Sequence, residues 1–373
     1  MKRLLIIHRA LAPYRIELFN WLFKQFDCKI YFEYGKPFEQ TFKEDFLKER
    51  MKFEYDILPS GFAGIANLRL SLPSILRREK PDIIMCSELN LITAILLLFK
   101  RMNGNPPLIA MCDDNLSIAQ HMLNHKKVNR YLLSSIDGMI GCDTRAIKLI
   151  SDRLGNSLKM HYLPIVQDDR YIRLRMQSQL DRATKIRESH DIKSEDKCIL
   201  FVGRLAEEKN LEYLIAQFGK LAQDEHHVHL MIVGEGALGA KLRHQSEQLT
   251  SSGRIHFVGK KEGDELYAYY AAGDMFVLPS KRDAFAAVVN EALIAGLPCI
   301  VSDIAGSVSM LNEHNGLSID INKEDDLVHK MQKLLKSLTQ PFSSSSLKPS
   351  LMPKTFDQYM IDLEQFINSL VQE

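Results

Sequence analysis

Short apolar segments, separated by stretches long enough for a helix, recur along the whole chain. The first half contains LLIIH, CKIYF, FEYDIL, DIIMC, LIAMC and GMIGC, and the second contains KCILFVG, VHLMIVG, RIHFVG, MFVLPS, PCIVS and GLSID. Strands that are apolar throughout are typical of parallel sheets that helices cover on both faces. Because the alternation of strand and helix runs through twice, the pattern predicts an α/β protein with two doubly wound domains.

The length of 373 residues is compatible with two domains, since a domain takes roughly 100–200 residues. We expect a first domain over 1–165, a linker with a helix over 166–196, a second domain over 197–340, and a Ser/Pro-rich connector with a final helix over 341–373. Apolar residues at spacings of three and four predict that the final helix is amphipathic and crosses back to the first domain. These residues are Phe356, Met360, Leu363, Ile367 and Leu370.

The net charge of +1 is unevenly spread along the chain. Residues 1–164 hold 24 Lys/Arg and 17 Asp/Glu, so +7, and the rest holds 24 and 30, so −6. An excess of positive charge favours an anionic partner or a membrane surface, although solvated lysines scattered without a patch would give the same count. No basic stripe is interleaved with aromatic residues, so we expect no nucleic-acid partner. The longest apolar run, Leu91–Phe99, is too short for a spanning helix of about 20 residues.

The segment FVGRLAEEKN, residues 201–210, joins a strand, a glycine and two cations. Gly203 permits a tight turn and a close approach of the backbone. Arg204 and Lys209 lie beside an expected helix start, where cations and backbone amides together attract an anion such as phosphate. The alternative is a solvated loop with one Arg and one Lys.

The segment IVGEGALGAKL, residues 232–242, follows a strand and opens a helix with Gly234, Gly236 and Gly239. This spacing matches the dinucleotide fingerprint. However, it lies on the second strand of its domain, and the acid expected about 20 residues later is missing. We therefore favour a nucleotide-side loop over a nicotinamide site.

The segment RDAFAAVVNEALIAG, residues 282–296, has a carboxylate on each side of a small, apolar run. We expect a helix from about Phe285, with Asp283 just before it and Glu291 about two turns in. A carboxylate among buried positions needs a polar partner, and hydroxyl groups of a bound sugar or ribose would supply one. Backbone N–H groups at the helix start would meet a phosphate; they belong to Phe285, Ala286 and Ala287. The alternative is an N-cap Asp and an exposed Glu.

Together, the three loops describe a pocket for a nucleotide diphosphate that carries a sugar. Residues 197–320 resemble the donor domain of glycosyltransferase family 4, one of the group 1 glycosyltransferases of GT-B architecture, which has two Rossmann-like domains. The resemblance rests on Gly203-Arg204…Lys209, Val233-Gly234-Glu235-Gly236, Leu278-Pro279-Ser280, Asp283-x7-Glu291 and Ala295-Gly296-Leu297-Pro298. The segment APYRIELFNWL, residues 12–22, resembles the first loop and helix of bacterial members that build surface polysaccharides.

Three departures from the family pattern stand out. Asp283 replaces the usual first Glu of the pair, and alanines stand at 284 and 286, where the family prefers glycine. Asp113 and Asp114 stand where many members carry a His after the fifth strand. On the acceptor side the resemblance points to Arg15, Asp113 and Asp114. Possible substitutes for the missing His are His8, His121 and His125, and the alternative for each is an ordinary loop or surface His.

The resemblance implies retaining transfer of a sugar from a nucleotide-diphosphate donor to a glycan or lipid-linked acceptor, in lipopolysaccharide, capsule or exopolysaccharide biosynthesis. It implies no cofactor and no metal, and no Asp-x-Asp follows a strand to hold one. It assigns catalysis to Arg204, Lys209 and Asp283, and donor binding to Gly203, Gly234, Gly236, Val258, Phe285, Ala286, Ala287 and Glu291. We expect a cytoplasmic protein with peripheral contact at the inner face of the plasma membrane. The alternatives are a GT-B sugar-nucleotide epimerase, a nicotinamide oxidoreductase and a nucleotide-sugar-binding protein without turnover.

Overall fold

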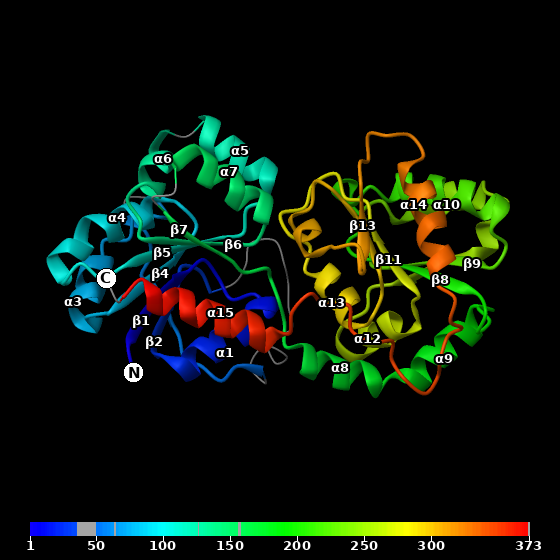
Figure 1. The fold of residues 1–373 in the computed structure, drawn as a ribbon, viewed down its shortest axis with the longest axis horizontal. Helices are drawn as coiled ribbons and strands as arrows, with labels where there is room; N and C mark the ends of the chain where they lie inside the picture. Colours follow the sequence, from blue (N-terminus) through cyan, green and yellow to red (C-terminus); the bar gives the residue numbers. More distant parts are fainter. Residues whose placement is uncertain (36–49, 63–64, 126, 156–157, 372–373) are drawn as a thin grey trace. The chain divides into compact units, whose positions relative to one another are not determined.

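The computed structural model describes residues 1–35, 50–62, 65–125, 127–155 and 158–371. The chain forms two compact units, shown in Figure 1. Unit 1 consists of Met1–Gln167 and Phe356–Glu373, and unit 2 consists of Asp168–Thr355. The segment expected as a linker carries two helices, α8 (Asp169–Gln177) and α9 (Leu180–Ser189), and both lie in unit 2.

Unit 1 is built on a parallel sheet with the strand order β3-β2-β1-β4-β5-β6-β7 in its described part. All six strand segments expected in the first half contribute to it, although FEYDIL supplies only a two-residue strand. A seventh strand was not predicted, because its four residues, KMHY, are half-buried at the sheet edge and form no apolar run. The strands are β1 (Arg3–His8), β2 (Asp27–Phe32), β3 (Asp56–Ile57), β4 (Ile83–Ser87), β5 (Leu108–Cys112), β6 (Gly138–Gly141) and β7 (Lys159–Tyr162).

Helices cover both faces of this sheet. Alternate strand residues such as Leu5 and Ile7 share one buried core with the helices α3 to α7. These helices are α3 (Leu72–Glu79), α4 (Leu91–Lys100), α5 (Leu116–His125), α6 (Lys127–Leu133) and α7 (Thr144–Leu154).

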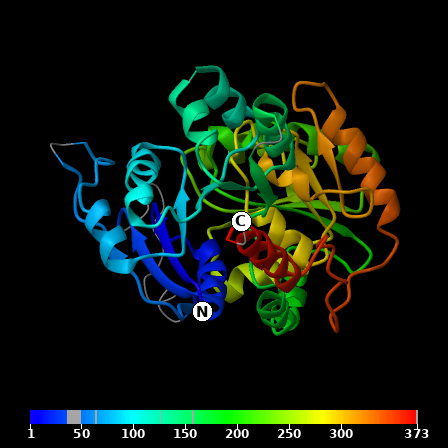
Figure 2. The same ribbon diagram turned by 60° about the vertical axis from the view of Figure 1, so that its left-hand side comes forward.

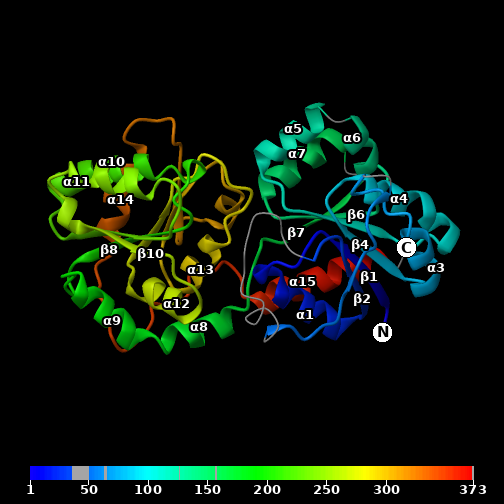
Figure 3. The same ribbon diagram turned by 180° about the vertical axis from the view of Figure 1, so that it is seen from behind.

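The opposite face carries α1 (Ile16–Gln25) and the final helix α15 (Phe356–Ser369), which lie side by side in Figures 1 and 3. The ring of Phe366 stacks on His161 of β7 at 5.1 Å between centroids. Leu370 packs directly on Gly138 of β6: a Cβ added to Gly138 would lie 2.7 Å from Cδ1 of Leu370. The predicted return of the last helix to the first domain is therefore confirmed.

Unit 2 is built on a second parallel sheet with the order β10-β9-β8-β11-β12-β13 in its described part. The strands are β8 (Lys197–Val202), β9 (Val228–Val233), β10 (Ile255–Gly259), β11 (Met275–Leu278), β12 (Cys299–Ser302) and β13 (Gly316–Ile319). Figure 1 shows α10 (Leu211–Asp224) and α14 (Asp326–Ser337) on one face, and α12 (Gly263–Ala272) and α13 (Val288–Ile294) on the other. The predicted architecture of two doubly wound domains is confirmed.

The Ser/Pro-rich connector between α14 and α15 is fastened along unit 2, as the orange-to-red trace in Figures 1 and 2 shows. Its Lys348 donates to Asp274 Oδ1 at 2.8 Å, and the same carboxylate accepts from the buried Arg187 at 2.9 Å. In the described part of the chain, no helix is long and apolar enough to cross a membrane.

Candidate functional site

The predicted donor-side residues lie at one edge of the unit 2 sheet. Since β8, β9, β10, β11 and β12 are parallel neighbours, their carboxyl ends share that edge, and the loops that follow them gather there. Gly203, Gly234 and the loop that ends with Asp283 follow three of these strands directly.

The loops after β8 and β9 interlock through their backbones, which explains the glycine spacing. Leu205 N–H donates to Glu235 O at 2.9 Å, and Leu238 N–H donates to Leu205 O at 3.0 Å. A Cβ on Gly234, which has φ +149°, would lie 1.8 Å from Gly203 O, and one on Gly236 would lie 2.5 Å from Leu205 O. No other residue fits either position. Loop packing therefore accounts for both glycines without a dinucleotide.

Lys209 and Asp283, which are 74 positions apart in the sequence, form a largely buried ion pair. Lys209 Nζ lies 2.5 Å from Asp283 Oδ2, and the two side chains are 16% and 12% exposed. The Lys209 side chain also lies beside Gly203, since a Cβ there would be 3.8 Å from its Cε. The pair joins the loops after β8 and β11 and holds a cation at the strand ends.

Arg204 differs from Lys209 in its exposure. Its guanidinium pairs with Glu208 at 2.8 Å, and the Arg204 side chain is 64% exposed. Glu208 also accepts the backbone N–H of Lys281 at 2.8 Å through its carbonyl oxygen. Arg204 is therefore a solvent-facing cation on a loop that is tied to the one after β11.

The helix that carries Glu291 begins later than expected. Helix α13 starts at Val288 rather than near Phe285, so Glu291 lies in its first turn and not two turns in. The N-cap is Ala287, and Asp283 caps nothing because it is paired with Lys209. The delay has a local cause: Ala286 has φ +71°, a left-handed conformation that breaks the helical path.

Glu291 has a protein partner that sequence reasoning missed. The hydroxyl of Tyr270 on α12 donates to Glu291 Oε2 at 2.7 Å. Burial and the neighbouring Glu291 charge raise the pKa of Tyr270 well above its usual value, so the phenol remains a donor. The tyrosine-rich segment YAYYAAGD, residues 267–274, was the sequence feature that could have pointed to a hydroxyl partner for Glu291. Tyr270 therefore fixes the carboxylate of Glu291 at the first turn of α13.

Backbone donors gather just before α13. Within the described part of the chain, the N–H groups of Phe285, Ala286 and Ala287 donate no hydrogen bond. Two fully buried hydroxyls from neighbouring loops, those of Ser280 and Ser307, likewise have no partner there. Unsatisfied donors of this kind are suited to an anion or a sugar.

The remaining donor-side candidate, Val258, lies inside β10. The next residue, Gly259, accepts the N–H of Gly234 at 2.9 Å through its carbonyl oxygen. The end of β10 is thus attached to the glycine loop after β9, and it offers backbone groups rather than reactive side chains.

The candidates in unit 1 form a separate cluster at the carboxyl edge of its own sheet. Arg15 is 2% exposed and makes an ion pair with Asp113, which follows β5 together with Asp114. His8, at the end of β1, packs edge-on against Phe19 at 5.2 Å. Burial lowers the pKa of His8 to about 4, and the Arg15 charge acts in the same direction. His8 is therefore neutral at pH 7.

Two acids of the same edge, Glu33 and Glu88, were not predicted. They follow β2 and β4 directly, and an acid immediately after a buried strand was the available signal. Burial raises the pKa of Glu33 to about 7, and the Glu88 charge adds to the effect. Glu88 pairs with Arg9 at 3.1 Å and has φ +62°. Left-handed backbone outside glycine is frequent at functional sites.

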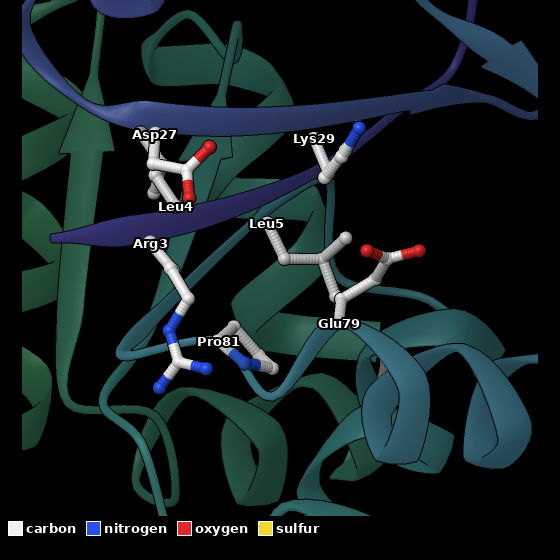
Figure 4. A pocket seen from close by; sticks show the side chains of 7 residues that line it. All are labelled: Arg3, Leu4, Leu5, Asp27, Lys29, Glu79 and Pro81. Carbon is white, nitrogen blue, oxygen red and sulfur yellow. The ribbon is translucent and has the colours of Figure 1, made fainter. Parts of the chain in front are cut away.

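A small pocket lies at the opposite edge of the unit 1 sheet, where β1 and β2 begin (Figure 4). Its volume is about 50 Å³, far below the ~300 Å³ or more of a typical ligand site. We assign it no part in the candidate site. Arg3, Leu4, Leu5, Asp27, Lys29, Glu79 and Pro81 line it.

A known protein family matches most of unit 2. Residues 182–341 match the family model described as Glycosyl transferases group 1. An uncharacterized glycosyltransferase of Methanocaldococcus jannaschii, MJ1607, is 33% identical over 150 residues, which are 40% of this chain and 38% of that protein. A GDP-mannose-dependent alpha-mannosyltransferase of Corynebacterium glutamicum is 33% identical over 141 residues, 38% of this chain and 32% of that protein. The chain thus spans about a third of the length of the curated relatives it matches.

Solved structures resemble the chain over both units. Anabaena HepE in complex with UDP-glucose has a TM-score of 0.70 at 15% identity and covers 100% of both chains. The apo form of the lipopolysaccharide outer core galactosyltransferase WaaB has a TM-score of 0.68 at 16% identity and covers 98% of this chain and 99% of its own. The fold is that of the two-domain GT-B glycosyltransferases. Within that fold, the group 1 match lies entirely in unit 2.

Proposed function

We propose that the chain is a retaining glycosyltransferase that transfers a sugar from a nucleotide-diphosphate donor to a glycan or lipid-linked acceptor, without a metal. The observation that carries the proposal is the partly buried Lys209–Asp283 pair beside the glycine loops. It combines a phosphate-binding cation with a carboxylate that can hold sugar hydroxyls. The group 1 match of the same segment supports this interpretation.

The donor would occupy the strand-end loops of unit 2. Lys209 and Arg204 would neutralise the charge that develops on the departing β-phosphate, and the N–H groups of Phe285, Ala286 and Ala287 would donate to its oxygens. Glu291, held by Tyr270, would accept hydrogen bonds from the ribose hydroxyls. Asp283 would hold hydroxyls of the transferred sugar.

The reaction itself needs no dedicated base. The bond from the sugar C1 to the phosphate oxygen breaks, and a bond from C1 to the acceptor oxygen forms on the same face. The acceptor proton passes to the leaving phosphate. Acids at the edge of the unit 1 sheet, Glu33 and Glu88, are suited to bind acceptor hydroxyls, and Arg15 and Asp113 would fix the adjacent loop.

Thermal unfolding with UDP, GDP, ADP, CMP and NAD(H), each at millimolar concentration, tests the donor site. A ligand at 100 times its dissociation constant adds about 2.7 kcal/mol of stability. We expect a shift with one nucleoside diphosphate; HepE has been solved with UDP-glucose, and the Corynebacterium relative is GDP-mannose-dependent. A shift with NAD(H) alone would overturn the proposal in favour of an oxidoreductase.

Turnover of the variants Arg204→Ala and Glu291→Ala tests the assigned roles. Loss of one charge-stabilising group lowers turnover by roughly 10²–10³, while an exposed ion pair such as Arg204–Glu208 contributes only about 0–1 kcal/mol to stability. The matched control is Lys148→Ala on α7, which removes a 77% exposed cation that pairs with Asp152 at 3.4 Å with the same i,i+4 spacing. Equal turnover of the Arg204 and Lys148 variants would contradict the proposal. Binding of the diphosphate without product from any acceptor would favour a non-catalytic binding protein.

We also propose a cytoplasmic location, at the inner face of the plasma membrane, and a role in surface polysaccharide biosynthesis. The resemblance of residues 12–22 to bacterial polysaccharide enzymes and the +7 charge of residues 1–164 support this part of the proposal.

A further inference from the structure

Helix α4 of unit 1 carries an apolar stripe on its outer side. Leu91, Ile95, Leu98 and Met102 recur at spacings of four, three and four, which places them on one side of the helix and of the 3-10 turn that follows it (Arg101–Asn103). Leu91, Leu98 and Met102 are 40%, 67% and 68% exposed, whereas Ile95 between them is half-buried and packs against the core. Single exposed apolar residues are ordinary, but several of them along one side of a helix mark an interaction surface.

The inner side of α4 already packs against the core, so the stripe is not the face by which this helix packs on the sheet. Ile92 and Leu96 are fully buried in the core that α4 shares with the sheet. Asn90 caps the helix by accepting the N–H of Ile92 at 2.8 Å, and Thr93 completes the capping box. The outward stripe is therefore held rigidly in place.

The helices on either side of α4 carry exposed cations. Helices α3 and α6 lie on the same face of the sheet as α4, and α4 stands between them in Figures 1 and 3. Residues 72–136, which hold α3, α4 and α6, contain eight Lys/Arg and five Asp/Glu, and one of these acids, Glu79, pairs with Arg78 at 2.8 Å. The exposed cations of these helices and their ends are Arg77, Arg78, Lys80, Arg101, Lys127 and Arg130.

We propose that this surface, the outer stripe of α4 with the cations of α3 and α6, docks unit 1 onto an anionic lipid membrane. The apolar stripe would enter the headgroup region, and the cations would contact lipid phosphates. A second copy of the chain fits poorly, because a symmetric interface would bring the same cations face to face. Exposed Val128 and Tyr131 of α6 extend the surface.

This inference deepens the proposed function, since it names the surface at which a lipid-linked acceptor would be met. Its test needs neither donor nor acceptor. We would measure co-sedimentation of the full chain with vesicles of equimolar phosphatidylcholine and phosphatidylglycerol, and with vesicles of phosphatidylcholine alone. We expect binding to the anionic vesicles that weakens as salt rises. Absence of binding would overturn the inference and leave the nucleotide test of the function untouched.

A matched pair of substitutions tests the location of the surface. Leu98→Glu places a charge in the stripe, whereas Leu174→Glu places one on α8 of unit 2, where Leu174 is 72% exposed. We expect Leu98→Glu to weaken vesicle binding at least tenfold and Leu174→Glu to leave it unchanged. Equal effects of the two substitutions would contradict the proposed surface.

A second pair keeps the test valid if the Leu98 variant unfolds. Each cation near an anionic membrane strengthens binding about fivefold. Arg101→Glu is therefore expected to weaken binding by at least that factor, while Lys241→Glu in unit 2 has no effect. Unchanged binding of the Arg101 variant would count against a lipid partner. Retention of the chain on immobilised protein but not on vesicles would replace the membrane with a protein partner.

Discussion

At the residue scale, the donor-side loops combine predictable and unpredictable features. The sequence correctly predicted the elements that carry Gly203, Gly234 and Asp283, because apolar strands and the glycines after them are local signals. The Lys209–Asp283 contact could not be predicted from spacing, since 74 residues separate the two. The left-handed backbone conformation of Ala286 could not be predicted either, because alanine is among the last residues expected in that conformation.

We predict that Ala286→Gly stabilises unit 2. The left-handed conformation costs a non-glycine residue ~1–2 kcal/mol, while the extra freedom of glycine in the unfolded chain costs ~0.4–1 kcal/mol, so the midpoints of the two ranges give a net gain of about 0.8 kcal/mol. The matched control is Ala216→Gly, because Ala216 is an exposed residue in the interior of α10, where glycine costs about 1 kcal/mol relative to alanine. Chemical denaturation should show opposite signs for the two variants. Destabilisation by both would mean that Ala286 is unstrained.

At the element scale, the features that the sequence did not predict depend on packing between segments that lie far apart in the chain. The charged segment 166–196 was expected as a linker with one helix, yet α8 and α9 both pack on α12 in unit 2. Arg187 of α9 explains part of this: its guanidinium is buried and donates to Asp274 and to three backbone carbonyls. A buried arginine cannot be distinguished from a solvated one in a sequence.

The amino ends of β9 and β10 bring histidines together. His229 and His256 stack at 5.4 Å, and His190 meets His256 edge-on at 4.8 Å. Burial, then the neighbouring His190 and His229, lower the pKa of His256 to about 4, and burial also lowers that of His229. The other charged groups that act on His229 are Asp196, Arg254, Arg187 and Asp191.

We predict that unit 2 loses stability as the pH falls from about 6.5 towards 4. A histidine with a lowered folded pKa binds its proton first in the unfolded chain, so its contribution is complete above the unfolded pKa and disappears on acidification. The substitution His256→Phe should flatten this dependence in urea unfolding. His314→Phe, at an 82% exposed side chain, is the control that should not. Parallel pH profiles of the two variants would refute the assignment to His256.

At the scale of the whole molecule, the repeated alternation of strand and helix was sufficient to predict the architecture. Two doubly wound sheets and a returning C-terminal helix follow from period and length alone. The edge strand β7 was missed because lysine and histidine occupy half of its four positions. The acceptor side was the least predictable part, since its candidates depend on ion pairs such as Arg15–Asp113 between distant segments.

We predict that calorimetry resolves separate responses of the two units. The bound nucleoside diphosphate should raise only the transition of unit 2. Leu363 of α15 is fully buried, so Leu363→Ala should lower the free energy of unfolding of unit 1 by about 2–5 kcal/mol and shift only the transition of that unit. Met331→Ala in α14, also fully buried, is the matched control for unit 2. A shift of both transitions by Leu363→Ala would show that the units unfold together.

The return of α15 to unit 1 has a consequence for biosynthesis. Unit 2 is one uninterrupted stretch of chain, whereas unit 1 needs residues from both ends. A ribosome therefore synthesises every residue of unit 2 before it makes the last helix of unit 1. Domains generally fold as units during synthesis, so the first unit to be translated is the second to be completed. Until α15 has been made, the sheet face that it covers stays open to water and to chaperones.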